Sequence, residues 1–90
     1  MYTGSASVLC PSVDVIAKRL DQASVLVHIQ TSQIFELNAT GTKVWEMLGE
    51  GLAVDRIVQH LVEEFEVGQS QAAEEVNALL VRLHGDGLLV

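Results

Sequence analysis

The spacing of apolar residues changes abruptly at Leu37 and Asn38, and this change restricts the folds that the chain can adopt. Before it, in "QIFEL", apolar and polar residues alternate, as in a β-strand with one buried face. After it, small and apolar residues recur every three or four positions, which is the spacing of one helix face. Asn38 lies between the two patterns, where its side-chain oxygen would cap a helix. The sequence therefore predicts strands first and helices second.

Three β-segments are expected before the change, at residues 13–20, 23–30 and 33–37. The first is the weakest, because its alternation is ambiguous. In the third, Phe35 and Leu37 share one face, while Ile34 and Glu36 point the other way. The second and third are separated only by a short polar turn at residues 31–33, so we expect them to form an antiparallel hairpin.

Three amphipathic helices are expected after the change. Gly49 and Gly51 end the first, and the second carries an apolar stripe from residue 54 to residue 65. We expect Ser70 to cap the third, and the apolar residues 88–90 to pack back on the domain. The predicted order is β-β-β-α-α-α, an α+β domain in which a three-stranded antiparallel sheet precedes a winged helix-turn-helix-like group of helices.

The length of 90 residues allows one domain at most. Residues 1–12 lack periodicity and are expected to form a flexible N-terminal segment, which could still add a strand at one edge of the sheet. Residues 13–90 are expected to form the domain. The composition is 49% hydrophobic but only 4% aromatic, so aliphatic side chains build the core. A small domain this apolar leaves apolar surface exposed, and an exposed apolar groove would suit a binding site.

Several function classes are disfavoured by composition. A net charge of −7 opposes nucleic-acid binding, because phosphate contacts need clustered lysine and arginine. The single cysteine, Cys10, excludes an internal disulfide and a cysteine-based zinc site. The sequence shows neither a signal peptide nor an apolar run near the ~20 residues that cross a bilayer, so we expect a cytoplasmic protein without membrane contact.

No catalytic or cofactor-binding pattern emerges from the sequence either. The three histidines lack metal-ligand spacing, the glutamates fit a solvated surface, and the Gly-containing turns do not match a phosphate-binding loop. An enzyme needs a constellation of reactive groups, and this chain offers none. We therefore expect no metal, no cofactor and no catalysis, and look for a binding function.

The third strand is the most informative element for binding. If it pairs with the second strand on one side only, its other edge presents free N–H and C=O groups, which are a template for an added peptide strand. The third helix would form the opposite wall, with Glu75, Leu79 and Arg82 contacting the guest while Val76 holds the core. The alternative, that the first strand or the N-terminal segment covers this edge, remains open at the level of sequence.

Residues 13–90 as a whole resemble the PqqD-like family, and three stretches carry the resemblance: "LNATGTKVWEML", "VDRIVQHLVEEFEV" and "AAEEVNALLVRLHGDGLL". The ordered set of matches carries the resemblance, since most matching residues are core or cap positions. The matching positions are Leu37, Asn38, Gly41, Val44, Trp45, Leu48, Gly51, Ile57, Leu61, Val76, Leu83, Gly87 and Leu88.

This resemblance implies a non-catalytic recognition protein that binds the leader segment of a ribosomally made precursor peptide. The leader would add as a strand to the third strand, against the third helix. The implied peptide-binding residues are Gln33, Ile34, Phe35, Glu36, Leu37, Glu75, Val76, Leu79 and Arg82.

Within the family, "TGTKVWEML" is most similar to the stand-alone leader-binding protein of lasso peptide biosynthesis. That likeness implies a second partner, a separate leader peptidase of the transglutaminase-like cysteine protease type. The hairpin "IQTSQIFEL" lacks the glycine that family members carry before the third strand. The alternatives are a peptide chaperone like that of the coenzyme PQQ pathway, a winged-helix DNA-binding regulator, and a small structural or dimerisation subunit.

Overall fold

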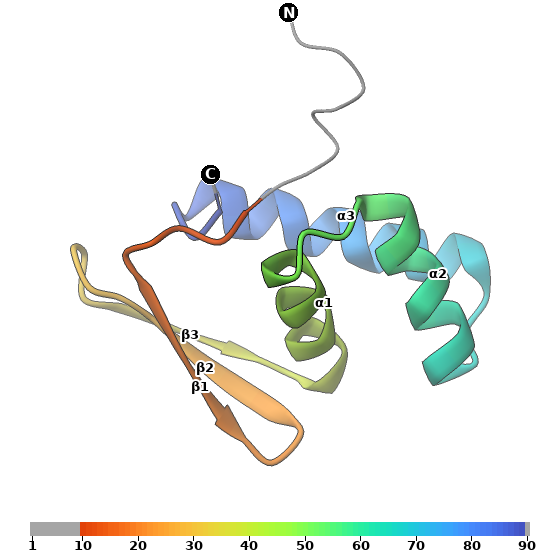
Figure 1. Cartoon of the computed structure of the whole chain (residues 1–90), viewed down its shortest axis with the longest axis horizontal. Coiled ribbons are helices and arrows are strands. Elements are labelled where there is room, and N and C mark those ends of the chain that lie inside the picture. The colour runs from red at the N-terminus through yellow and green to blue at the C-terminus, as the bar shows by residue number, and fades with distance from the viewer. Residues whose placement is uncertain (1–9, 90) are drawn as a thin grey trace, which may run out of the picture.

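The computed structural model describes residues 10–89, which form a small sheet and three helices (Figure 1). The elements are β1 (Val15–Leu20), β2 (Ala23–His28), β3 (Gln33–Leu37), α1 (Ala39–Gly49), α2 (Val54–Phe65) and α3 (Gln69–Gly85). The predicted α+β order of three antiparallel strands followed by three helices is confirmed. The further likeness to a winged helix-turn-helix domain stays a prediction.

The sheet has the order β1-β2-β3, and both strand pairs are antiparallel. A two-residue turn, Asp21 and Gln22, joins β1 to β2, with Asp21 in the left-handed region at φ 61°. At the centre of the register, Leu26 lies opposite Ala17 on β1 and Phe35 on β3. Since β2 is the middle strand, it is the only one of the three with a sheet neighbour on each side within residues 10–89.

One face of the sheet is buried against the helices. The predicted alternation on β3 is confirmed, because Leu37 is buried and Phe35 half-buried, while Ile34 and Glu36 are exposed. On β2 the fully buried side chains include the polar Ser24, whose hydroxyl forms a 2.8 Å hydrogen bond with the hydroxyl of Thr42 on α1. That bond satisfies both groups and fixes α1 on the sheet.

The loop between β2 and β3 differs from the prediction. It spans residues 29–32 instead of 31–33, because strand pairing on β2 stops at His28. Its last residue, Ser32, adopts φ 62°, and its N–H donates to the His28 carbonyl at 2.8 Å. A serine thus occupies the left-handed position that a glycine would occupy without steric cost.

Helix α1 begins after Asn38, which caps it as predicted. The Asn38 Oδ1 atom accepts a 2.8 Å hydrogen bond from the Gly41 N–H, which satisfies one of the free donors of the first turn. A Cβ added at Gly41 would lie 3.3 Å from both Asn38 Oδ1 and a methyl carbon of Leu37. The absence of a side chain at Gly41 therefore permits the tight passage from β3 into α1.

The start of α3 is where the capping prediction is wrong. Ser70 lies inside the helix, and Gly68 holds the N-cap position. The Gly68 carbonyl already accepts a 2.9 Å hydrogen bond from the Ala72 N–H, so the helical hydrogen-bond pattern begins two residues before Ser70. Ser70 is exposed at the second position of the helix, where the first turn is already formed.

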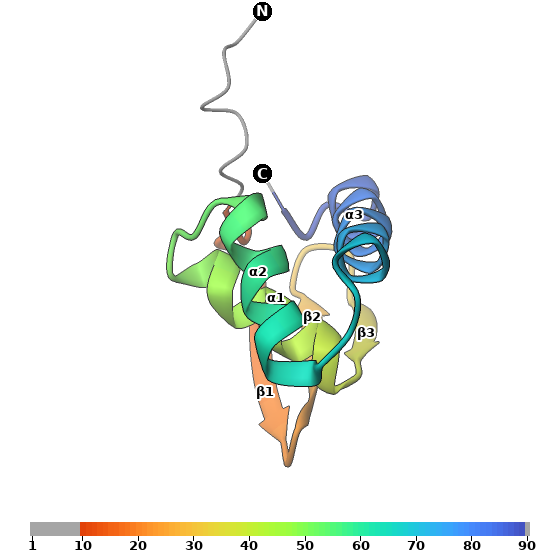
Figure 2. The ribbon, with the colours of Figure 1, turned by 90° about the vertical axis from the view of Figure 1, so that its right-hand side faces the viewer.

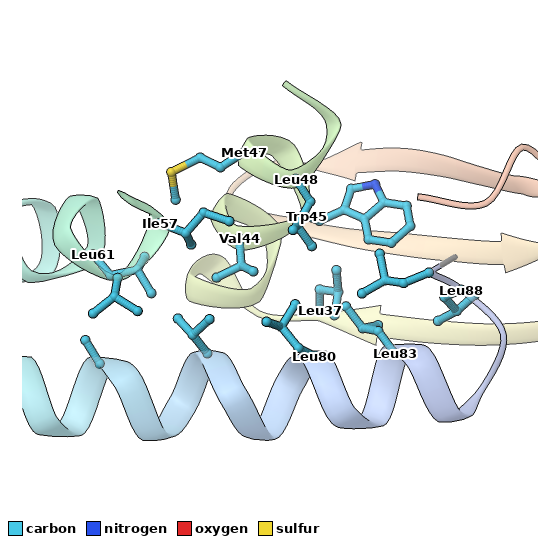
Figure 3. Close-up of a cluster of buried hydrophobic side chains, with 14 of the residues drawn as sticks. Leu37, Val44, Trp45, Met47, Leu48, Ile57, Leu61, Leu80, Leu83 and Leu88 are labelled. Atoms are coloured by element: carbon cyan, nitrogen blue, oxygen red, sulfur yellow. The ribbon is translucent and has the colours of Figure 1, made fainter. Parts of the chain in front are cut away.

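The core lies between the sheet and the three helices, with α1 at its centre (Figure 3). Helix α1 contacts β2, β3, α2 and α3. The fully buried large side chains are Leu26, Val44, Leu48, Ile57, Leu61, Val76, Leu83 and Leu88. The aliphatic core expected from the composition is therefore present, and Trp45 is its one buried aromatic residue within the described range.

The two ends of the described chain meet. Leu88 and Leu89 are buried, as predicted, and Ser12 N–H donates to the Leu88 carbonyl at 2.9 Å beside a Pro11–Leu89 bridge. Residues 1–9, which belong to the expected flexible segment, and Val90 lie outside the described residues. Between residues 10 and 89, none of the helices combines the length and apolar content that a bilayer crossing requires.

Candidate functional site

The sequence left open whether the first strand or the N-terminal segment covers the outer edge of β3, and the sheet order bears on this question. Strand β1 pairs with β2 on the side away from β3, so it does not cover the outer edge of β3. Of the N-terminal segment, Pro11 is described and pairs with Leu89, at the C-terminal end of the domain. Within residues 10–89, therefore, β3 is an edge strand without a second partner strand.

The pairing pattern also shows which backbone groups of β3 point outward. In an antiparallel sheet, each residue of a middle strand directs its N–H and C=O to one neighbour, and successive residues alternate. The Ile29 N–H donates to the Asp14 carbonyl at 2.9 Å, which places the odd-numbered residues of this segment toward β1. The even-numbered residues of β2 then bond to β3 at its odd-numbered positions. By this alternation the N–H groups of Ile34 and Glu36 face away from the sheet.

A groove of about 900 Å³ lies between the C-terminal end of β3 and helix α3. Figure 2 shows β3 and α3 on the same side of the molecule, with β1 and α2 toward the other side. Six of the nine residues implied by the family resemblance line it: Glu36, Leu37, Glu75, Val76, Leu79 and Arg82. The structure therefore brings the predicted strand and helix residues together around one groove.

The other three implied residues, Gln33, Ile34 and Phe35, precede the groove on β3 and do not line it. Ile34 is 67% exposed, so its side chain is accessible to a guest at the strand edge. Phe35 is half-buried against the core instead. These three residues extend the edge beyond the groove, and their role in binding is still a prediction.

Sequence reasoning missed the floor of the groove. It is formed by the first turns of α1, through Asn38, Thr40, Gly41 and Val44, and by residues at the β1–β2 turn, including Leu20 and Ala23. The Asn38 cap and the period change indicate a corner here. The sequence alone does not show that the corner faces α3, because that depends on how α3 packs across the domain.

The groove combines apolar residues on its helix wall with three charged residues at its rim. Val76 is fully buried and Leu79 is half-buried, whereas Glu36, Glu75 and Arg82 are exposed. The ion pairs within residues 10–89 lie elsewhere: Arg19 pairs with Glu46, and Lys43 with Glu64 at 3.5 Å. An apolar groove with a few charged groups and an open strand edge suits an extended peptide better than a small reactive substrate.

The described residues give no sign of metal chemistry. Across residues 10–89, no group of three or more histidine, cysteine, aspartate or glutamate side chains is placed to hold a metal ion. His28 is buried, and its Nδ1 accepts a 3.3 Å hydrogen bond from the Gln30 N–H, which indicates a structural role in the loop. Cys10 is exposed at the surface.

Comparison with known proteins assigns the family. The family model described as coenzyme PQQ synthesis protein D (PqqD) matches residues 23–89, from the second strand to the end of the described domain. This chain belongs to the PqqD family. The resemblance drawn from the sequence is thereby confirmed. No curated protein matches the chain.

Two solved structures share the fold of this PqqD-family protein. One, described as "TbiB1 in Complex with the TbiA(beta) Leader Peptide", has a TM-score of 0.84 and 30% sequence identity, and covers 89% of this chain and 93% of its own. The other, "Lasso peptide synthetase B1 complexed with the leader peptide", has a TM-score of 0.84 and 22% identity, and covers 92% and 98%. The first structure supports the expected likeness to a protein that binds a leader peptide, and the second, at 22% identity, bears on the fold alone.

Proposed function

We propose that this protein binds the leader segment of a ribosomally made precursor peptide, that of a lasso peptide, in extended form, and that it catalyses no reaction itself. The leader adds as a fourth strand to the outer edge of β3 and lies in the groove against α3. The observation that carries this proposal is the outer edge of β3, which has no partner strand within residues 10–89 and lies beside that groove. Family membership and a 30% identical structure that holds a leader peptide support it.

The physical basis of such binding is the completion of a sheet. The outward N–H and C=O groups of an edge strand gain hydrogen bonds to the guest backbone, which supply affinity for any extended peptide. Side chains that alternate toward α3 would then contact the half-buried Leu79 on the helix wall. The backbone bonds make the site permissive, and the groove makes it selective.

The second half of the proposed function is presentation. The bound leader would be offered to a separate leader peptidase, a transglutaminase-like cysteine protease, which removes it. This division of labour agrees with the absence of a reactive constellation in the sequence. Leader cleavage by the peptidase, measured with and without this protein, should be faster with it.

The test of leader binding is a titration of a fluorescently labelled leader peptide, encoded by the precursor gene beside this one, followed by anisotropy. We expect saturable binding with a Kd on the order of 1 µM or tighter, equivalent to about −8 kcal/mol. A scrambled leader of the same composition is the control and should not compete. A genuine neighbouring leader that fails to bind would refute the proposal.

Two other functions predict different binding results. A peptide chaperone of the coenzyme PQQ type would bind a PQQ precursor peptide in preference to a lasso leader. A DNA-binding regulator would shift duplex DNA in a salt-dependent manner, which the net charge of −7 opposes, as does α3, where Arg82 is the one lysine or arginine.

A further inference from the structure

The charged residues at the rim of the groove are ordered along it. Strand β3 and helix α3 run in opposite directions (Figure 1). Glu75 therefore lies toward the end where β3 passes into α1, and Arg82 lies toward the end where β3 begins. Glu36 is the charged groove residue on the strand side. The groove thus has an acidic end and a basic end on its helix wall.

None of these three rim charges is engaged in an ion pair within residues 10–89. Glu75 accepts one long side-chain hydrogen bond, at 3.3 Å, from Gln71, which is also exposed and leaves the carboxylate charge uncompensated. Arg82 is the only basic residue among those that line the groove. Because the chain as a whole carries a charge of −7, an anionic guest residue meets a favourable partner here at one position.

The spacing of the two helix charges can be converted into residues of a guest strand. Arg82 lies seven positions after Glu75, and a helix rises 1.5 Å per residue, so the two positions are roughly 10 Å apart along the groove. A strand rises about 3.3 Å per residue, which makes this distance about three residues. Since only alternate side chains of a strand face one wall, the matching guest positions are about two or four residues apart.

We propose that Glu75 and Arg82 set the register and direction of the guest strand by its charges. The guest carries a basic side chain opposite Glu75 and an acidic side chain opposite Arg82. Both existing strand pairs in the sheet are antiparallel, and an antiparallel guest on β3 runs in the same direction as α3. It therefore meets Glu75 first, so the basic residue precedes the acidic residue by two or four positions.

This inference rests on the proposed leader-binding function, but it makes a claim of its own. Backbone hydrogen bonds along β3 are the same for every extended peptide, and sliding the guest by two residues preserves them. Side-chain charges are not preserved by such a slide. A reversed guest would place a carboxylate opposite Glu75 and a cation opposite Arg82, which costs affinity by like-charge repulsion, and a shifted guest would lose the two attractive pairs.

The experiment uses the full-length protein and the leader peptide encoded beside it. Each acidic residue of the peptide is replaced in turn by its amide, each basic residue by glutamine, and every peptide is titrated against the native protein, Arg82→Gln and Glu75→Gln. The control variants are Arg56→Gln and Glu74→Gln, which remove the same charges from exposed helix positions outside the groove.

We expect one acidic peptide position whose amide weakens binding to the native protein by about two- to fivefold, the range of an exposed ion pair, and 0.5 M NaCl to reduce this effect. In Arg82→Gln the same replacement should change Kd by less than about 1.5-fold, while the control variants keep the full effect. One basic position, two or four residues earlier, should couple to Glu75 in the same way.

The proposal is overturned if the leader binds but no acidic position couples to Arg82, or if the coupled basic position follows the acidic one. In either case leader binding itself stands, and only the charge-ordering claim fails. A leader that does not bind the native protein at all would instead refute the proposed function and this inference together.

Discussion

Replacing Ile34 or Glu36 by proline tests directly whether a guest pairs with the edge of β3. Proline has no N–H and is tolerated on edge strands whose N–H faces solvent. The alternation of hydrogen bonds in the sheet directs the N–H groups of Ile34 and Glu36 outward. Each substitution therefore removes one donor from the proposed guest interface and none from the pairing of β3 with β2.

The expected size of the effect follows from one lost hydrogen bond. A hydrogen bond contributes about 0.5–1.5 kcal/mol net, and every 1.4 kcal/mol is a tenfold change in Kd. Each proline should therefore weaken leader binding by about two- to twelvefold. The unfolding free energy should change little, because Ile34 and Glu36 are both exposed and neither N–H serves the sheet.

The assay is leader anisotropy, with the midpoint of thermal unfolding measured on the same samples. A matched control is Ala17→Pro, which lies on the opposite edge of the sheet and points its N–H outward by the same alternation. It should leave leader affinity unchanged. Phe35→Pro is the opposite control, because it removes an N–H that bonds to β2, and it should unfold the domain.

The edge mechanism would be refuted if both Ile34→Pro and Glu36→Pro folded normally and bound the leader with native affinity. Loss of affinity in Ala17→Pro alone would indicate that the guest pairs with β1 instead.

Three further substitutions test the core, a helix end and the groove. Trp45→Ala should lower the unfolding free energy in urea by about 3–5 kcal/mol, because Trp45 is only 8% exposed; a loss below about 1 kcal/mol would contradict its place in the core. Glu66→Gly should raise the unfolding free energy by about 1 kcal/mol, because Glu66 ends α2 in the left-handed region at φ 55° and places a negative charge at a helix C-terminus. Glu66→Ala removes only the charge and should therefore raise the unfolding free energy less. Leu79→Ala should weaken leader binding severalfold in the anisotropy assay; unchanged affinity would remove Leu79 from the interface.

Local signals account for the parts of the fold that the sequence predicts well. Asn38 caps α1 as expected, because the cap depends on residues only three positions apart. The alternation on β3 likewise identifies Leu37 as buried and Glu36 as exposed. Ser70 shows the limit of such reasoning, since a good capping residue does not cap when the helix has already begun at Gln69.

The location of the site depends on long-range strand pairing and helix packing, which local sequence patterns do not show. Whether β3 lies at the edge depends on where β1 pairs, which is a long-range choice between two sides of β2. The helix wall was predictable from the apolar stripe of α3 together with the family resemblance. The floor at Thr40 and Gly41 was not, because it depends on the orientation of α1 relative to α3.

The central claim, that a leader strand pairs with the free edge of β3, is tested most directly by amide hydrogen exchange followed by NMR, with and without saturating leader peptide. The account predicts that the N–H groups of Ile34 and Glu36 exchange rapidly in the free protein and become protected in the complex. The outward N–H of Ala17, on the β1 edge, should exchange at the same rate in both states. Saturating leader that leaves Ile34 and Glu36 unprotected, or that protects Ala17 instead, would contradict the account.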